Sequence, residues 1–148
     1  PMDRNNGQEE YVFQHIMVPV DLGHAAKLQK ALRVAADVAG HYGARVTYVG
    51  VTSGQPSSVA HTPKEFAEKL ATFAAKEGEA NTLSDVASHA ITAHDPAVEL
   101  DRKLAAAVQE IGADLVVMGS HIPRTFEFGS HGGRLATHTD VSVMLVRD

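Results

Sequence analysis

Two spacings of apolar residues alternate along the chain. Short, continuously apolar or β-branched runs predict strands, and apolar residues recurring every three or four positions predict helices. Strands are expected at 11–20, 45–51, 86–93, 113–119 and 141–146. Helices are expected at 24–43, from Pro63 towards Gly78, from Pro96 to Gly112, and from about 130 to 138. Strands that alternate with helices pair in parallel through right-handed crossovers, so the pattern predicts a doubly wound α/β fold.

The helix boundaries carry recognisable signals. Thr62 is placed to cap a helix that starts with Pro63, and Glu65 is placed to complete a capping box. Asp95 and Pro96 repeat the pattern of a capping residue followed by proline. The expected buried stripes are Leu28, Leu32, Ala35 and Ala39; Phe66, Leu70 and Phe73; and Leu100, Leu104, Ala107 and Ile111.

The turns after the first and fourth expected strands are the natural place for a ligand. In a doubly wound sheet, ligands bind outside the carboxyl ends of the strands, where the strand order reverses. Asp21 follows the first strand and Gly119 ends the fourth. We therefore expect these two separated segments to converge on one crevice.

Composition narrows the class of protein. The 148 residues carry a net charge of −5, which argues against binding to nucleic acid or to an anionic membrane surface. There is no cysteine, which excludes disulfides and thiolate chemistry, and no apolar run reaches the length of a membrane span. The polar start of the chain lacks a signal-peptide core, so we expect a cytoplasmic protein. Residues 1–10 are expected to be a mobile tail before a single domain, 11–148.

Three stretches carry a resemblance to a known family. They are VPVD (18–21), GADLVVMGSH (112–121) and GSHGGRLATHTDVSVMLV (129–146), and in this order and spacing the chain resembles the universal stress protein family. The resemblance implies a five-stranded parallel sheet in the order 3-2-1-4-5 with helices on both faces, similar to the adenine-nucleotide alpha-hydrolases. It also implies a role in stress response, a homodimer paired through the last strand (141–146), and ATP binding in many members.

The family's phosphate loop is present in a shortened form. Its signature is a glycine, two residues, a second glycine, nine residues, and then Gly-Ser or Gly-Thr. Gly119 matches the first glycine and Gly129-Ser130 matches the final pair, but Ile122 stands where the second glycine is expected. Residues 120–128 make the loop three residues shorter than the pattern.

A site for an adenine nucleotide follows from the resemblance. Asp21 corresponds to the acid near the ribose, and Val20 and Val51 would lie against the adenine. Gly119, Ser120, Gly129 and Ser130 would surround the phosphates, and Arg124 could bind a phosphate through two parallel hydrogen bonds. Any Mg²⁺ would be carried by the phosphates of ATP or AMP. The full predicted set is Pro19, Val20, Asp21, Val51, Gly119, Ser120, His121, Arg124, Gly129, Ser130 and His131.

Two functions stay open at this stage. The chain is either a regulatory protein that binds ATP, ADP or AMP, or a dimeric interaction module that has lost nucleotide binding with the shortened loop. Asp21 and Ser130 could then be only helix caps, and Gly119 and Gly129 only turn residues. A small phosphoester hydrolase is a third hypothesis. We expect no catalytic residues and at most slow ATP hydrolysis, because no general base is evident. The nine histidines lack the local spacing of a metal site, so none is expected.

Overall fold

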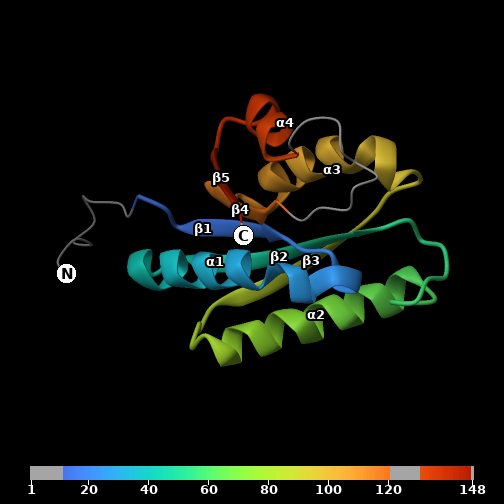
Figure 1. The fold of residues 1–148 in the computed structure, drawn as a ribbon, viewed down its shortest axis with the longest axis horizontal. Coiled ribbons are helices and arrows are strands. Elements are labelled where there is room, and N and C mark those ends of the chain that lie inside the picture. The colour runs from blue at the N-terminus through green and yellow to red at the C-terminus, as the bar shows by residue number, and fades with distance from the viewer. Residues whose placement is uncertain (1–11, 121–130, 148) are drawn as a thin grey trace.

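The computed structural model describes residues 12–120 and 131–147, and strands and helices alternate along both ranges (Figure 1). The strands are β1 (His15–Pro19), β2 (Arg45–Thr52), β3 (Val86–Thr92), β4 (Leu115–Gly119) and β5 (Ser142–Val146). The α-helices are α1 (Gln29–Tyr42), α2 (Pro63–Ala80), α3 (Pro96–Ile111) and α4 (His131–His138), and a 3-10 helix, η2 (Leu22–Leu28), precedes α1.

The strands form one parallel sheet in the order β3-β2-β1-β4-β5. The expected order is therefore confirmed. The chain adds β2 and β3 on one side of β1, then crosses to add β4 and β5 on the other. The direction of growth reverses between β1 and β4, which is where a doubly wound sheet opens a crevice at its carboxyl edge.

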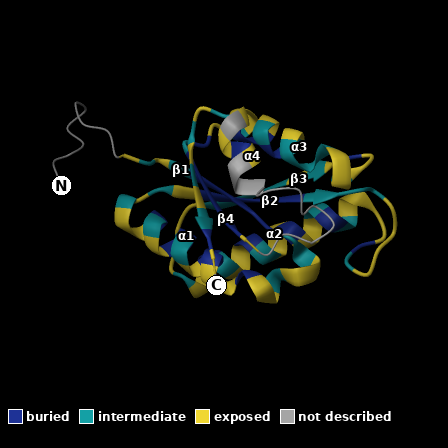
Figure 2. Ribbon diagram, turned by 45° about the horizontal axis from the view of Figure 1, so that its top comes forward, coloured by how far each residue is buried: buried dark blue, intermediate teal, exposed yellow. Residues whose placement is uncertain are grey.

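Helices cover both faces of the sheet, as expected (Figure 1). Alternate residues of each strand point to opposite faces, so Leu115 and Val117 of β4 pack in the layer with α1 and α2. Val116 and Met118 pack in the layer with α3 and α4. The central strands are therefore buried on both sides, and the exposed residues lie mainly on the outer faces of the helices (Figure 2).

The predicted helix ends are largely confirmed. Gly43 and Gly112 end α1 and α3 in the left-handed conformation, with φ of 67° and 74°. Thr62 caps α2 by accepting the Glu65 amide at 3.0 Å. The Glu65 carboxylate, however, accepts the amide of His61 and not that of Thr62, so the capping box is displaced by one residue.

Three local expectations were wrong. The Asp95 side chain makes no capping hydrogen bond, and only its backbone carbonyl accepts from the first turn of α3. The first strand begins at His15 because the amides of Gln14 and His15 donate to the Asp114 carboxylate. The helix expected over 24–43 is divided: residues up to Leu28 belong to η2, which is kinked at His24, and the α-helix begins only at Gln29.

The buried stripes are those expected. Leu28, Leu32, Ala35 and Ala39 are all buried, as are Phe66, Leu70, Leu104 and Ala107, while Phe73, Leu100 and Ile111 are partly buried against the same two clusters. None of the helices within the described ranges combines the length and the apolar character needed to cross a bilayer. The expected tail, 1–10, and residues 121–130 of the expected phosphate loop lie outside the described residues.

Candidate functional site

A cavity of about 280 Å³ lies at the carboxyl ends of β1 and β2. Its described lining comes from the two strand ends, from the turn after β1, from residues 53–59 after β2, from the first turn of α2 and from the first three turns of α3. The lining residues are Pro19, Val20, Asp21, Leu22, Gly23, Val49, Val51, Thr52, Ser53, Gln55, Ser57, Val59, Phe66, Pro96, Leu100 and Leu104. The cavity therefore stands at the edge of the sheet where the topology predicts a ligand.

Most of the lining is apolar. Val20 and Phe66 belong to the hydrophobic cluster on the α1 and α2 side, whereas Val49 and Leu104 belong to the cluster on the α3 side. The cavity is thus bounded by both layers of the fold. Such a surface suits a flat apolar group, because burying it removes apolar area from water without leaving polar atoms unpaired.

Gly50 allows the aromatic wall of the cavity to approach the sheet. A Cβ added at Gly50 would lie 2.9 Å from Cζ of Phe66 and 3.3 Å from Cδ2 of Leu70. Any larger residue on β2 at this point would therefore push α2 and the Phe66 ring outward. The position of this wall depends on a glycine that the sequence pattern did not single out.

Asp21 lies at the rim, directly after β1, and both of its carboxylate oxygens are engaged. Oδ1 accepts the Gly23 amide at 3.1 Å, and Oδ2 lies 2.9 Å from Nδ1 of His24. The capping role considered for Asp21 is therefore confirmed, since it caps η2. A carboxylate can accept up to about four hydrogen bonds, so a ribose hydroxyl could still be added.

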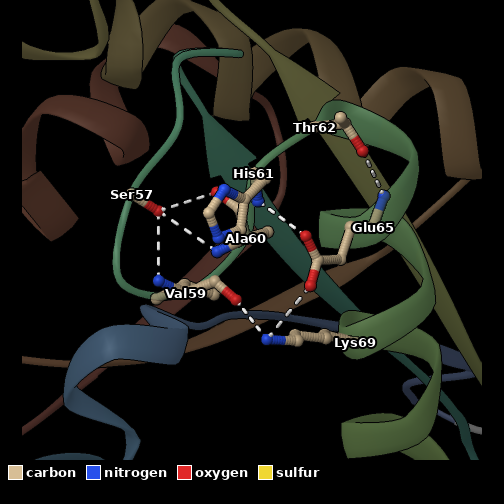
Figure 3. Close-up of polar contacts among 7 residues, drawn as sticks. All are labelled: Ser57, Val59, Ala60, His61, Thr62, Glu65 and Lys69. Carbon is tan, nitrogen blue, oxygen red and sulfur yellow. Dashed lines mark hydrogen bonds and ion pairs between the residues drawn. The ribbon is translucent and has the colours of Figure 1, made fainter.

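The polar part of the lining comes from the chain between β2 and α2. Ser53, Gln55 and Ser57 contribute hydroxyl and amide groups, and Val59 an apolar one. Figure 3 shows how the end of this 53–61 segment is held against α2. Among the described lining residues there is no lysine, arginine or histidine to balance a phosphate charge.

The predicted site residues fall into distinct groups. Pro19, Val20, Asp21 and Val51 all line the cavity. Gly119 and Ser120 do not, although β4 ends at the same edge; the Ser120 amide donates to the Val146 carbonyl of β5 at 2.9 Å. His121, Arg124, Gly129 and Ser130 lie outside the described residues, and the backbone of His131 begins α4. The phosphate-binding part of the site therefore stays a prediction.

Sequence reasoning missed the second half of the lining. The sequence pattern places Phe66, Leu100 and Leu104 only in the core and gives residues 52–61 no part in the site. The available signal was positional: residues directly after β2 must lie at the same edge as Asp21, because the strands are parallel. The path of the segment beyond that point depends on contacts with α2, which no local pattern encodes.

Glu65 is the titratable group beside the cavity with a perturbed pKa. The hydrogen bond from the His61 amide, assisted by the Lys69 ammonium, lowers the pKa of this carboxyl below its usual value. Within the described ranges, no three histidine or acidic side chains converge as they would at a metal site.

Comparisons with known proteins agree with this architecture. The model of the universal stress protein family matches residues 13–147. No curated protein sequence matches significantly. Among solved structures, a universal stress protein in complex with cAMP is 18% identical, with a TM-score of 0.66 over 91% of this chain and 97% of that one. A universal stress protein from Archaeoglobus fulgidus in complex with dAMP is 18% identical, with a TM-score of 0.63; the match covers 90% of this chain and 98% of that one. A protein of the universal stress protein family from Burkholderia pseudomallei is 22% identical, with a TM-score of 0.65; the match covers 90% of this chain and 95% of that one.

Proposed function

The chain belongs to the universal stress protein family, and from this premise we propose that it is a regulatory protein that binds an adenine nucleotide, AMP, ADP or ATP, at the carboxyl edge of the sheet. The observation that carries the proposal is the apolar cavity of about 280 Å³ with Asp21 at its rim. This volume is close to the lower end of the roughly 300–1,000 Å³ of small-molecule sites. Two solved relatives of the same fold hold cAMP and dAMP.

Each part of the nucleotide has a place in the proposal. The adenine enters the apolar cavity between Val20 and Val51, and a ribose hydroxyl adds to the hydrogen bonds that Asp21 already accepts. The phosphates extend towards Gly119, Ser120 and the shortened loop that follows, with Mg²⁺ carried on them where more than one phosphate is present. The apolar character of the described lining supports binding through the nucleoside part, so both AMP and ATP should bind.

Calorimetric titration of the full chain with AMP and ATP tests this proposal. We expect dissociation constants below about 1 mM for both nucleotides. Val51→Phe, which places a large ring in the cavity, should weaken binding at least about tenfold. The matched control is Val98→Phe, because Val98 is 78% exposed on α3 and lies outside the lining.

Two results would contradict the proposal. If neither nucleotide bound below millimolar concentration, the proposal of nucleotide binding would fail and the alternative of a dimeric interaction module would stand. If both bound but Val51→Phe had no effect, the site would lie elsewhere on the molecule.

A homodimer paired through β5 is the second part of the proposal. β5 is an edge strand that pairs with β4 alone, and Met144 on it is 40% exposed. An apolar edge strand is a ready template for a second copy of itself. Sedimentation should therefore give a dimer for the wild type and a monomer for Met144→Lys. A monomeric wild type at high protein concentration would overturn this part. The cytoplasmic location expected from the sequence stays a prediction.

A further inference from the structure

The 53–61 segment crosses from the end of β2 to the start of α2 and forms one wall of the cavity. Ser53, Gln55, Ser57 and Val59 all line it. At its far end the segment reaches the turn after β1: a Cβ added at Gly23 would lie 3.6 Å from Cγ2 of Val59. The segment therefore spans the cavity from the β2 side to the β1 side.

The segment is folded into a compact turn by Ser57. The Ser57 amide donates to the Ala60 carbonyl at 2.8 Å. The Ser57 hydroxyl oxygen accepts the amides of Val59 and Ala60 at 3.1 and 3.3 Å (Figure 3). These bonds close the turn on itself. They hold the residues of the turn together without attaching it to the rest of the protein.

The polar contacts between the turn and α2 come from two side chains of that helix. The Lys69 ammonium donates to the Val59 carbonyl, and it lies 3.5 Å from the Glu65 carboxylate. The other oxygen of that carboxylate accepts the His61 amide at 2.6 Å (Figure 3). Glu65 and Lys69 thus form one connected latch, and each of them holds a backbone group of the segment.

The latch is exposed, whereas the turn it holds packs on the core. The Lys69 and Glu65 side chains keep 51% and 37% of their accessible area. Exposed ion pairs and charged hydrogen bonds are screened by water, so each one is weak. The turn is also held by Val59 and Ala60, which pack on the cluster of the α1 and α2 side. Because these are small side chains, loss of the latch lowers the free energy needed to lift the turn while the sheet beneath it stays folded.

We propose that the 53–61 segment is a lid over the cavity and that Glu65 and Lys69 are its positioning residues, which set how often the cavity opens. That the occupant of the gated cavity is an adenine nucleotide rests on the proposed function above. The gating itself is a property of the lid and the latch, and it can be measured without a ligand.

The absence of native cysteine allows a direct test on the full chain. A thiol introduced by Val20→Cys lines the cavity at a position that is only 7% exposed, and its rate of reaction with methyl methanethiosulfonate, a small neutral reagent, reports opening of the cavity. Adding Lys69→Met, which removes the donor but keeps the apolar stem, should accelerate the reaction about tenfold. Lys69→Arg should restore the slow rate, and Lys76→Met, an exposed lysine on the same helix with no contact to the lid, should leave it unchanged.

A second thiol separates lid opening from general loss of stability. Val116 is completely buried in the cluster on the α3 side. The reaction of a Val116→Cys thiol therefore requires unfolding of the core, and Lys69→Met should not change its rate. An equal acceleration at both thiols, or no acceleration at the Val20→Cys thiol, would overturn the proposal.

Binding kinetics connect the lid to its ligand. With AMP as the probe, line shapes of the Val51 amide resonance give the dissociation rate, and Lys69→Met should raise it at least about fivefold. If Lys69→Met accelerates the reaction of the Val20→Cys thiol but the wild type binds no AMP, the lid stands and the proposed function fails. If AMP binds to both proteins and dissociates from the wild type and from Lys69→Met at the same rate, the nucleotide site stands and the gating role fails.

Discussion

Tyr48 is a polar residue in a fully apolar place. Its ring lies on β2 among the buried residues of the α1 and α2 side, edge-on to Phe73 with ring centroids 5.6 Å apart. Its hydroxyl is buried and finds no hydrogen-bond partner within the described part of the chain. Burial, and then the Glu77 carboxylate, raises the pKa of this phenol above its usual value, so the group is neutral at neutral pH.

We predict that Tyr48→Phe leaves the free energy of unfolding unchanged or raises it by up to about 1 kcal/mol, because a buried hydroxyl without a partner costs about that much. Tyr48→Ala should lower it by about 3–5 kcal/mol, since the whole ring is then lost from the core. Urea denaturation measures both. A loss of more than about 1 kcal/mol in Tyr48→Phe would mean that the hydroxyl has a partner after all.

His15 occupies the opposite, amino edge of the sheet. Its Nε2 lies 2.6 Å from Oγ1 of Thr47, a buried polar side chain. Burial, and then the nearby Arg45 guanidinium, lowers the pKa of His15 below 6.5, and the Asp114 and Asp85 carboxylates oppose the shift only in part. The folded state therefore binds the proton less readily than the unfolded state.

The sign of the pH dependence follows. The free energy of unfolding should fall as the pH drops below 6.5, until the folded form is protonated as well. His15→Gln removes this titration. As the pH falls through that window, the free energy of unfolding should therefore decrease less for His15→Gln than for the wild type. His94→Gln, at an exposed position, is the control. Parallel pH profiles for wild type and His15→Gln would show that His15 does not titrate differently on folding.

Elements whose signals are local could be predicted from the sequence. The stripe of α1 and the glycine stops at Gly43 and Gly112 depend on residues within a few positions of each other. The start of β1 could not be predicted, because it is set by Asp114, about a hundred residues away. The displaced capping box has a similar cause: the Glu65 carboxylate reaches past Thr62 to the 53–61 segment.

Close contact between α2 and β2 leads to a prediction at the scale of the element. Gly50→Ala should lower the free energy of unfolding by about 1–3 kcal/mol, because its Cβ would meet the Phe66 ring at 2.9 Å. Gly40→Ala is the matched control: it lies in α1 with no atom within 4 Å of the added Cβ. It should raise stability by about 0.5–1 kcal/mol. Equal effects of the two substitutions would contradict the tight α2–β2 contact.

The whole fold could be predicted from the sequence, but the site could be predicted only in part. Alternating strands and helices predicted the parallel α/β fold, and the family resemblance supplied the strand order that the structure confirms. Asp21 and Val51 do share a cavity, as the pattern predicts, and their role towards a nucleoside stays a prediction. The wall formed by the 53–61 segment was missed because side chains of α2 position it. The phosphate half and the assignment of 11–148 to a single domain stay predictions.

The most direct test of the central claim is a titration of the ¹⁵N-labelled full chain with AMP, followed by amide chemical shifts. The cavity at the ends of β1 and β2 predicts saturable shifts at Gly23, Val51 and Ser53, which lie around it. Gly43 and Gly112, at the opposite edge of the sheet, should not move. No saturable shift up to millimolar AMP, or shifts confined to that opposite edge, would contradict binding in the cavity.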